Sequence, residues 1–458
     1  MLFTTDKQTL EDLNIFGKQG GDSIYNIFNR CTTRGGAAIL EEMFQYPLSD
    51  HEAINRRSGI IQHFAASGIS FPFAASLFDA AEPYLSNTDE RTRLSATEQP
   101  SIGKKISHLI APDADTVQIH KGVQALVELI KSAHTLVASP VLQESSHYRG
   151  DREAMAALLA DPALQSVLQT NSKGKLSHTS IIEYDTLFRF RHRNTLLKLL
   201  RYIYYLDVYM AVAGVARERS FVFPQALPRE QHLTKAEGVY HPQVSHAVPN
   251  SIHITPDSNV IFLTGANMAG KSTFMKSLSI ALFLAHMGFP VAAAHMEFAV
   301  LDGIFTTINL PDNLGMGASH FYAEVLRVKK VAQELNQGKQ LFIVFDELFR
   351  GTNVKDACEA TIAITEAFAR QRNSQFIIST HIIEAGAVLQ QSCANVHFIY
   401  LPTHMNNHQP VYTYTLEEGI TDDRHGMIII NNEKILEMLH AGCQEPVEAP
   451  SHSLASGE

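Results

Sequence analysis

The stretch that decides the fold is VIFLTGANMAGKSTFMKSLSIALFL, residues 260–284. An apolar run leads into Gly265-Ala-Asn-Met-Ala-Gly270-Lys271-Ser272, which fits the pattern G-x-x-x-x-G-K-[ST], and a helical pattern follows. Glycines let the backbone curl so that several N–H groups point at one phosphate chain, and the following helix adds its positive end. A chance glycine-rich turn is a poor explanation for eight matched positions, and the stretch predicts a phosphate-binding loop.

The loop residues have distinct expected tasks. Lys271 should reach the β- and γ-phosphates of ATP, and Ser272 should ligate Mg²⁺. Nucleotide contacts are expected from the loop and the start of its helix: Gly265, Asn267, Met268, Ala269, Gly270, Lys271, Ser272 and Thr273.

Hydrolysis needs an acidic element besides the loop. The apolar run LFIVF, residues 341–345, is followed directly by Asp346 and Glu347. A buried strand ending in two carboxylates would place Asp346 near the Mg²⁺ and leave Glu347 as the general base for the attacking water. The alternative is a solvated acidic turn, which the upstream loop disfavours.

A third apolar run, residues 376–378, leads through Ser379 and Thr380 to His381. A lone histidine at a strand end is more often structural. After a phosphate loop and an Asp-Glu strand, we expect His381 to contact the γ-phosphate.

The segment DNLGMGASHFYAE, residues 312–324, is a glycine-rich turn leading into a helix that we expect to run from Ser319 to about residue 335. Two interpretations stay open for Ser319. It is either a plain N-cap or part of a second anion-binding helix start, directed at the ATP of a neighbouring subunit.

The pattern of apolar residues divides the rest of the chain into regions. Residues 1–115 read as a mostly helical core-like domain and residues 116–232 as a helical lever region. The clearest helical pattern covers residues 181–217, with an apolar stripe of Leu196, Leu199, Leu200, Ile203, Leu206, Met210 and Ala213. From about residue 233 to 440, short apolar runs alternate with helical stretches, which predicts a parallel sheet covered by helices. Residues 441–458 read as a disordered tail.

Composition restricts the class of protein. The chain has 458 residues, 45% of them hydrophobic and 18% charged, which is typical of a globular protein with two to four domains. Its four cysteines lie far apart and no signal peptide is evident, so we expect a reducing, cytoplasmic location. The net charge of −10 argues against a wholly basic nucleic-acid-binding surface.

Residues 277–294 approach a membrane span in length, but His286, Gly288 and Pro290 interrupt them. We expect a buried helix, a turn and a buried strand there.

The runs TGANMAGKST, DNLGMGASHFYAE, FDELFRGT and STH, in this order, resemble the ATPase domain of the MutS DNA mismatch-repair family. Residues 33–57 and 199–216 are similar to the family's core domain and lever helix. The resemblance implies an α/β P-loop ATPase domain of the ABC type, preceded by an all-α core and lever domain. It also implies a homodimer with two composite ATP sites, in which Ser319 acts on the partner's ATP.

Two departures from the family pattern shape the functional expectation. The core-like segment begins near residue 20, so we expect neither a mismatch-binding domain nor a connector domain, and we do not expect mismatch recognition. The C-terminal dimerisation element should be shortened, and the usual serine before its glycine region is replaced in Asp423-Arg424-His425-Gly426.

Two weaker signals complete the candidate site. Tyr414, expected in a strand over residues 410–416, stands where the family tends to place a ring against adenine; the alternative is an ordinary exposed tyrosine. A basic cluster on the lever region either meets DNA phosphates or makes a solvated face with internal salt bridges: Arg189, Arg191, His192, Arg193, Lys198 and Arg201.

The leading hypothesis is therefore a MutS-like ATPase that acts on DNA or on a DNA-bound partner. The alternative is a mechanochemical or scaffold ATPase that acts on protein or RNA. An ABC transporter subunit is disfavoured because no LSGGQ-type signature is present.

Overall fold

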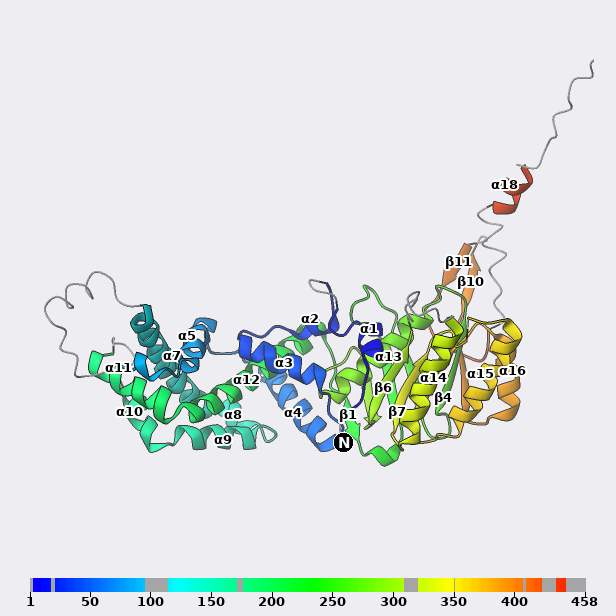
Figure 1. Ribbon diagram of the computed structural model, residues 1–458. Helices are drawn as coiled ribbons and strands as arrows, with labels where there is room; N and C mark the ends of the chain where they lie inside the picture. The colour runs from blue at the N-terminus through cyan, green and yellow to red at the C-terminus, as the bar shows by residue number, and fades with distance from the viewer. Residues whose placement is uncertain are drawn as a thin grey trace, which may run out of the picture.

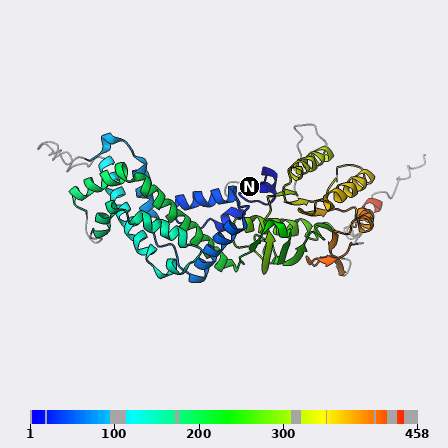
Figure 2. The same cartoon turned by 90° about the horizontal axis from the view of Figure 1, so that it is seen from below.

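The computed structural model describes residues 3–17, 21–94, 114–170, 176–308, 320–349, 351–406, 409–421 and 434–441. The molecule is elongated, with a helical half at one end and a sheet-containing half at the other (Figure 1). Seen from below, the two halves again lie end to end (Figure 2). The expected order, helices first and strands with helices after, is confirmed.

The first part of the chain, up to residue 219, is helical, and all of its helices except α1 form the helical half. The elements of this first part are α1 (Lys7–Asp12), α2 (Ile24–Phe28), α3 (Arg34–Gln45), α4 (His51–Ser67), α5 (Ala75–Ser86), η1 (Glu90–Thr92), α7 (Ala114–Val137), α8 (Pro140–Glu144), α9 (Arg149–Leu159), η2 (Pro162–Leu164), α10 (Gln165–Gln169), α11 (His178–Asp185), η3 (Thr186–Arg191) and α12 (Arg193–Arg219).

The other half contains the sheets. Its elements are β1 (Gln225–Leu227), η4 (Arg229–Gln231), β2 (Thr234–Val239), β3 (Asn250–Ile254), β4 (Val260–Gly265), α13 (Lys271–His286), β5 (His295–Ala299), β6 (Gly303–Thr307), α14 (His320–Asn336), β7 (Leu341–Phe345), α15 (Val354–Ala369), β8 (Gln375–Ser379), α16 (Ile383–Ser392), β9 (Val396–Leu401), β10 (Thr403–Asn406), β11 (Gln409–Tyr412), β12 (Glu417–Glu418) and α18 (Ile435–Ala441).

The larger sheet has the strand order β12-β9-β4-β8-β7-β6. Its strands are parallel except β12, which pairs antiparallel with β9. Strands β4, β7 and β8 are buried along their whole length, as their apolar runs predicted. A smaller sheet, β1-β5-β2-β3, begins with a strand upstream of residue 233.

The long helix expected over residues 181–217 is interrupted, and that prediction was wrong in its continuity. A wide turn of π type, η3, precedes α12, and the backbone leaves helical geometry at His192, where φ is −119°. Within this turn Arg189 forms a fully buried ion pair with Asp185, which lies one turn earlier. The predicted apolar stripe of α12 is confirmed, because all seven of its residues are buried.

Helix α12 joins the halves and also holds the start of α3 in place. Asp207 on α12 accepts hydrogen bonds from the backbone N–H groups of Thr32 and Thr33, at 3.0 and 2.8 Å, and from the Thr33 hydroxyl at 2.7 Å. The Thr33 hydroxyl in turn accepts a bond from the N–H of Gly36 and caps α3. One buried carboxylate therefore fixes the start of α3 against α12.

Among the described residues, α12 alone is long and apolar enough to cross a membrane by length and composition. However, 67% of its most apolar window is buried inside the protein. The predicted buried helix within residues 277–294 is confirmed as α13, whereas the predicted strand is reduced to a single bridge between Val291 and Val222.

The N-terminal segment packs on the sheet half and not on the helical half. Thr4 forms a parallel bridge with Gly303 at the edge of β6. Asp12 accepts bonds from the Thr306 hydroxyl and the Ile308 N–H, at 2.8 and 2.9 Å. Thr4 thus extends the sheet beyond β6, and helix α1 packs beside that strand.

Candidate functional site

The predicted phosphate loop lies at the carboxyl end of β4, between β9 and β8, and leads directly into α13. Gly265 and Gly270 have φ angles of +143° and +104°, which side chains rarely adopt. A Cβ on Gly265 would lie 3.0 Å from the carbonyl oxygen of Leu401 on β9. The curl of the loop therefore depends on glycine at both ends.

Lys271 folds back over this loop. Its ammonium donates to the carbonyl oxygens of Gly265 and Ala266, at 2.8 and 3.2 Å, and the residue is only 5% exposed. Burial lowers the pKa of Lys271, while the carboxylates of Asp346 and Glu347 oppose that change. The structure thus places a desolvated cation inside the curve of the loop.

Other loop residues differ in exposure. Met268, with a φ of +69°, is 78% exposed, and Asn267 and Thr273 are also exposed. Ala269 is buried. The exposed side chains are free to meet a ligand or a second subunit.

The Asp346 carboxylate accepts hydrogen bonds from hydroxyl groups of two neighbouring elements. The Ser272 hydroxyl donates to one carboxylate oxygen at 2.5 Å, and the Ser379 hydroxyl donates to the other at 2.8 Å. The Asp346 N–H donates to the carbonyl of Thr307 on β6. Carboxylate and hydroxyl oxygens are ligands that Mg²⁺ accepts, and Mg²⁺ is usually held by one or two carboxylates plus water and phosphate. The predicted pair Ser272 and Asp346 therefore fits this ion, although among the described residues no group of three or more His, Cys, Asp or Glu side chains is placed to hold a metal ion by itself.

Glu347 and His381 meet beside this group. The imidazole Nε2 and a Glu347 carboxylate oxygen are 2.8 Å apart, and both side chains remain accessible, 40% for His381 and 28% for Glu347. Glu347 has a φ of +54°, an unusual conformation for a non-glycine residue. Two side chains 34 residues apart in the chain are thus brought into contact at the ends of β7 and β8.

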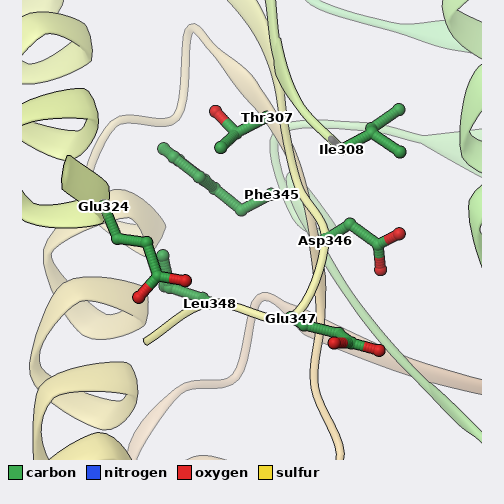
Figure 3. A pocket seen from close by; sticks show the side chains of 7 residues that line it. All are labelled: Thr307, Ile308, Glu324, Phe345, Asp346, Glu347 and Leu348. Atoms are coloured by element: carbon green, nitrogen blue, oxygen red, sulfur yellow. The ribbon is translucent and has the colours of Figure 1, made fainter. Parts of the chain in front are cut away.

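A small recess lies next to the two carboxylates (Figure 3). It is lined by Thr307, Ile308, Glu324, Phe345, Asp346, Glu347 and Leu348, and its volume is about 10 Å³. A volume of that order holds about one water molecule and no nucleotide. Figure 3 shows the Glu324 carboxylate beside Leu348, whereas the carboxylates of Asp346 and Glu347 lie together on the opposite side of the strand end.

Tyr414 does not lie in a strand, and that part of the prediction was wrong. Strand β11 ends at Tyr412, and Tyr414 adopts a left-handed φ of +58°. The Asn250 amide donates to the Tyr414 carbonyl at 2.9 Å and accepts from the Leu416 N–H at 2.8 Å, which holds this turn. A Cβ on Gly270 would lie 3.0 Å from the Tyr414 ring, so the ring lies against the phosphate loop.

Ser319 lies outside the described residues. The helix expected after it is present as α14, beginning at His320.

The basic cluster separates into two groups. The Arg189 side chain is fully buried against Asp185, and Arg193 donates to the carbonyl of Leu85 at 2.7 Å. Internal pairing therefore accounts for Arg189, and it cannot contact DNA. Arg191, Lys198 and Arg201 are exposed.

Two polar residues of the site were not singled out from the sequence. Ser379 stands two positions before His381, and its bond to Asp346 follows only from the pairing of β7 with β8. Asn250 is 8% exposed at the start of β3, and the alternation of apolar and polar residues that follows it was the available signal for that strand.

Two models of protein families match the chain: MutS domain III over residues 8–213 and MutS domain V over residues 261–441. DNA mismatch repair protein MutS of Streptococcus suis (strain 98HAH33) is 31% identical over 258 residues, which cover 54% of this chain and 30% of that protein. The protein of the same name from Geobacillus sp. (strain WCH70) is 29% identical over 257 residues, which cover 54% of this chain and 29% of that protein. That from Bacillus cytotoxicus is 30% identical over 275 residues, which cover 58% of this chain and 30% of that protein. The matched segments thus span about 30% of the length of these relatives.

Proposed function

This chain belongs to the MutS family, and on that premise we propose that it binds ATP with Mg²⁺ at residues 265–273 and hydrolyses it. The observation that carries the proposal is the hydrogen-bonded group Ser272–Asp346–Ser379 beside the phosphate loop. Parallel α/β sheets bind ligands at the carboxyl ends of their strands, where this group lies. Residues 233–440 are the proposed ATPase domain.

Each side chain has a role in the proposed reaction. Lys271 would leave the loop carbonyls and pair with the β- and γ-phosphates, which offer its ammonium a full negative charge. Ser272 and Asp346 would hold Mg²⁺, which, when bound, neutralises phosphate charge. Glu347 would take a proton from the attacking water, and His381 would contact the γ-phosphate while its bond to Glu347 orients that carboxylate.

The first test separates binding from hydrolysis. We expect Lys271→Ala to abolish ATP binding, because the phosphates lose the only cation that the loop contributes. We expect Glu347→Gln to bind ATP as the wild type does and to turn it over about 100-fold or more slowly, because an amide cannot act as a base. Lys276→Ala on the same helix and Glu359→Gln on α15 are matched controls. Normal ATP affinity in Lys271→Ala would refute the loop assignment, and unchanged turnover in Glu347→Gln would place the base elsewhere.

We further propose that two copies close on ATP through Ser319. The chain already has one phosphate-binding loop, and a second anion-binding helix start would serve the ATP of a partner. Glu347→Gln with ATP should therefore run as a dimer in light scattering, and adding Ser319→Arg should return it to a monomer. A double variant that still dimerises fully would show that Ser319 only caps its own helix.

We propose DNA, or a DNA-bound partner, as the object of the ATPase. The support is the family itself, since the relatives named above carry the description DNA mismatch repair protein. The ATPase rate should rise with duplex, mismatched or branched DNA, and retention on DNA should fall with salt. A rate that responds to RNA or to a protein partner but to no DNA would favour the alternative scaffold function.

A further inference from the structure

A cavity of about 350 Å³ lies between α4, α9 and α12, away from the phosphate loop. Its size falls in the range of pockets that hold small molecules, roughly 300–1,000 Å³. In Figure 1 these helices meet where the helical half approaches the sheets. The cavity is lined by Leu48, Ala53, Arg56, Arg57, Ile60, Tyr148, Asp151, Tyr202, Tyr205 and Tyr209.

The cavity carries an excess of positive charge. Arg56 pairs with Asp151 at 2.9 Å, which leaves the Arg57 charge as the net charge of the lining, two cations against one anion. Among the described residues, no carboxylate lies within ion-pairing distance of Arg57, and its guanidinium donates one hydrogen bond, to the carbonyl of Met287 at 2.9 Å. A guanidinium has five N–H donors, so most of its capacity is unused by the protein.

Partial burial adds to the cost of the unpaired positive charge of Arg57. Burial lowers the pKa of Arg57, and the neighbouring Tyr209 and Tyr205 shift that pKa in the opposite direction. Arg57 is partly buried, and a partly buried cation without an anion carries a desolvation cost that an anionic ligand would reduce. Arginine is also the side chain that best matches the oxygens of a phosphate.

The walls of the cavity are suited to an aromatic ring as well as to an anion. Four of the ten lining residues are tyrosines, and three of them come from successive turns of α12. Burial raises the pKa of Tyr209 to about 12, so its hydroxyl remains a hydrogen-bond donor at neutral pH. The rings of Tyr205 and Tyr209 have centroids 6.0 Å apart, which puts two aromatic surfaces on one wall.

We propose that this cavity binds a phosphorylated aromatic molecule of mononucleotide size, with its phosphate on Arg57 and Arg56 and its ring among the tyrosines. The site is separate from the proposed ATP site and does not depend on that function. Arg57 also contacts Met287, the C-cap residue of α13, which is the helix that starts at the phosphate loop. The ligand would therefore lie at the far end of that helix.

The test is calorimetric titration of the full chain carrying Lys271→Ala, which removes the main cation of the phosphate loop. The probes are adenosine monophosphate, adenosine and inorganic phosphate. We expect one site for the monophosphate and binding at least tenfold weaker for either fragment alone, because each fragment engages only one part of the cavity.

Variants locate the binding. Arg57→Gln, Arg56→Gln at the exposed rim and Tyr202→Ala should each weaken the monophosphate about tenfold or more, the size expected for one charge-assisted contact. Arg34→Gln, an exposed arginine outside the cavity, should leave the affinity unchanged. Absence of monophosphate binding at millimolar concentration would overturn the proposal. If Arg56→Gln and Tyr202→Ala both bound the monophosphate as tightly as the chain with the unchanged cavity, the proposal would also be overturned, even if Arg57→Gln failed to fold.

Discussion

Lowering the pH should destabilise the sheet half through one buried histidine, His286. Its ring is fully buried at the end of α13, between the rings of Phe3 and Phe298. The Nδ1–H donates to the carbonyl of Leu282 at 2.8 Å, and Nε2 accepts from the Leu301 N–H at 3.0 Å. A proton on Nε2 would face the Leu301 donor and break that bond.

The magnitude follows from the pKa. Burial lowers the pKa of His286 from 6.5 to about 4. His286 therefore takes up a proton below pH 6.5 in the unfolded chain but only near pH 4 in the folded protein. The free energy of unfolding falls as the pH falls through that window. Between pH 7 and pH 5 the loss amounts to about 2 kcal/mol.

The assay is urea unfolding at pH 7 and pH 5, followed by circular dichroism because the chain has no tryptophan. With a denaturant slope of about 3 kcal/mol/M, the His286 contribution lowers the urea midpoint by roughly 0.7 M. Gln at position 286 keeps a donor and an acceptor but cannot titrate. Between pH 7 and pH 5 the urea midpoint of His286→Gln should therefore fall by roughly 0.7 M less than that of the wild type. The exposed His295→Gln serves as the control and should behave like the wild type. Equal pH dependence in wild type and His286→Gln would refute the reasoning.

Three further predictions concern other parts of the molecule. Tyr414→Ala should weaken ATP and GTP unequally in nucleotide titrations, because a ring against the phosphate loop would contact the base; an equal loss for both would count against that role. Gly36→Ala should cost about 1–3 kcal/mol in urea unfolding, because its methyl group would overlap the Asp207 carboxylate, and unchanged stability would mean that α3 can shift. Asp6→Ala should cost about 3 kcal/mol, since the 7%-exposed side chain of Arg327 on α14 loses its ion-pair partner; Asp257→Ala, whose pair with an arginine is exposed, is the control and should cost less than about 1 kcal/mol.

The sequence alone determined the elements that local patterns specify. Apolar runs of three to five residues located β4, β7 and β8, because central strands of a parallel sheet are buried on both faces and need apolar residues throughout. The glycine-lysine-serine run located the loop, since its conformation depends on residue types next to each other in the chain. The candidate residues follow from the same patterns: Lys271 and Ser272 end the glycine-rich run, Asp346 and Glu347 follow one apolar run, and His381 stands three positions after another.

Tertiary structure alone decided the contacts between distant segments. Asp207 and Thr33 are 174 residues apart, and Asp12 and Thr306 are 294 residues apart. Spacing along one helix or strand carries no information about such partners. The packing of residues 4–12 on β6, the interruption before α12 and the turn at Tyr414 belong to the same class. So does the cavity at Arg57, because its walls come from three helices and a cavity is a property of how helices pack, which no single stretch of sequence encodes.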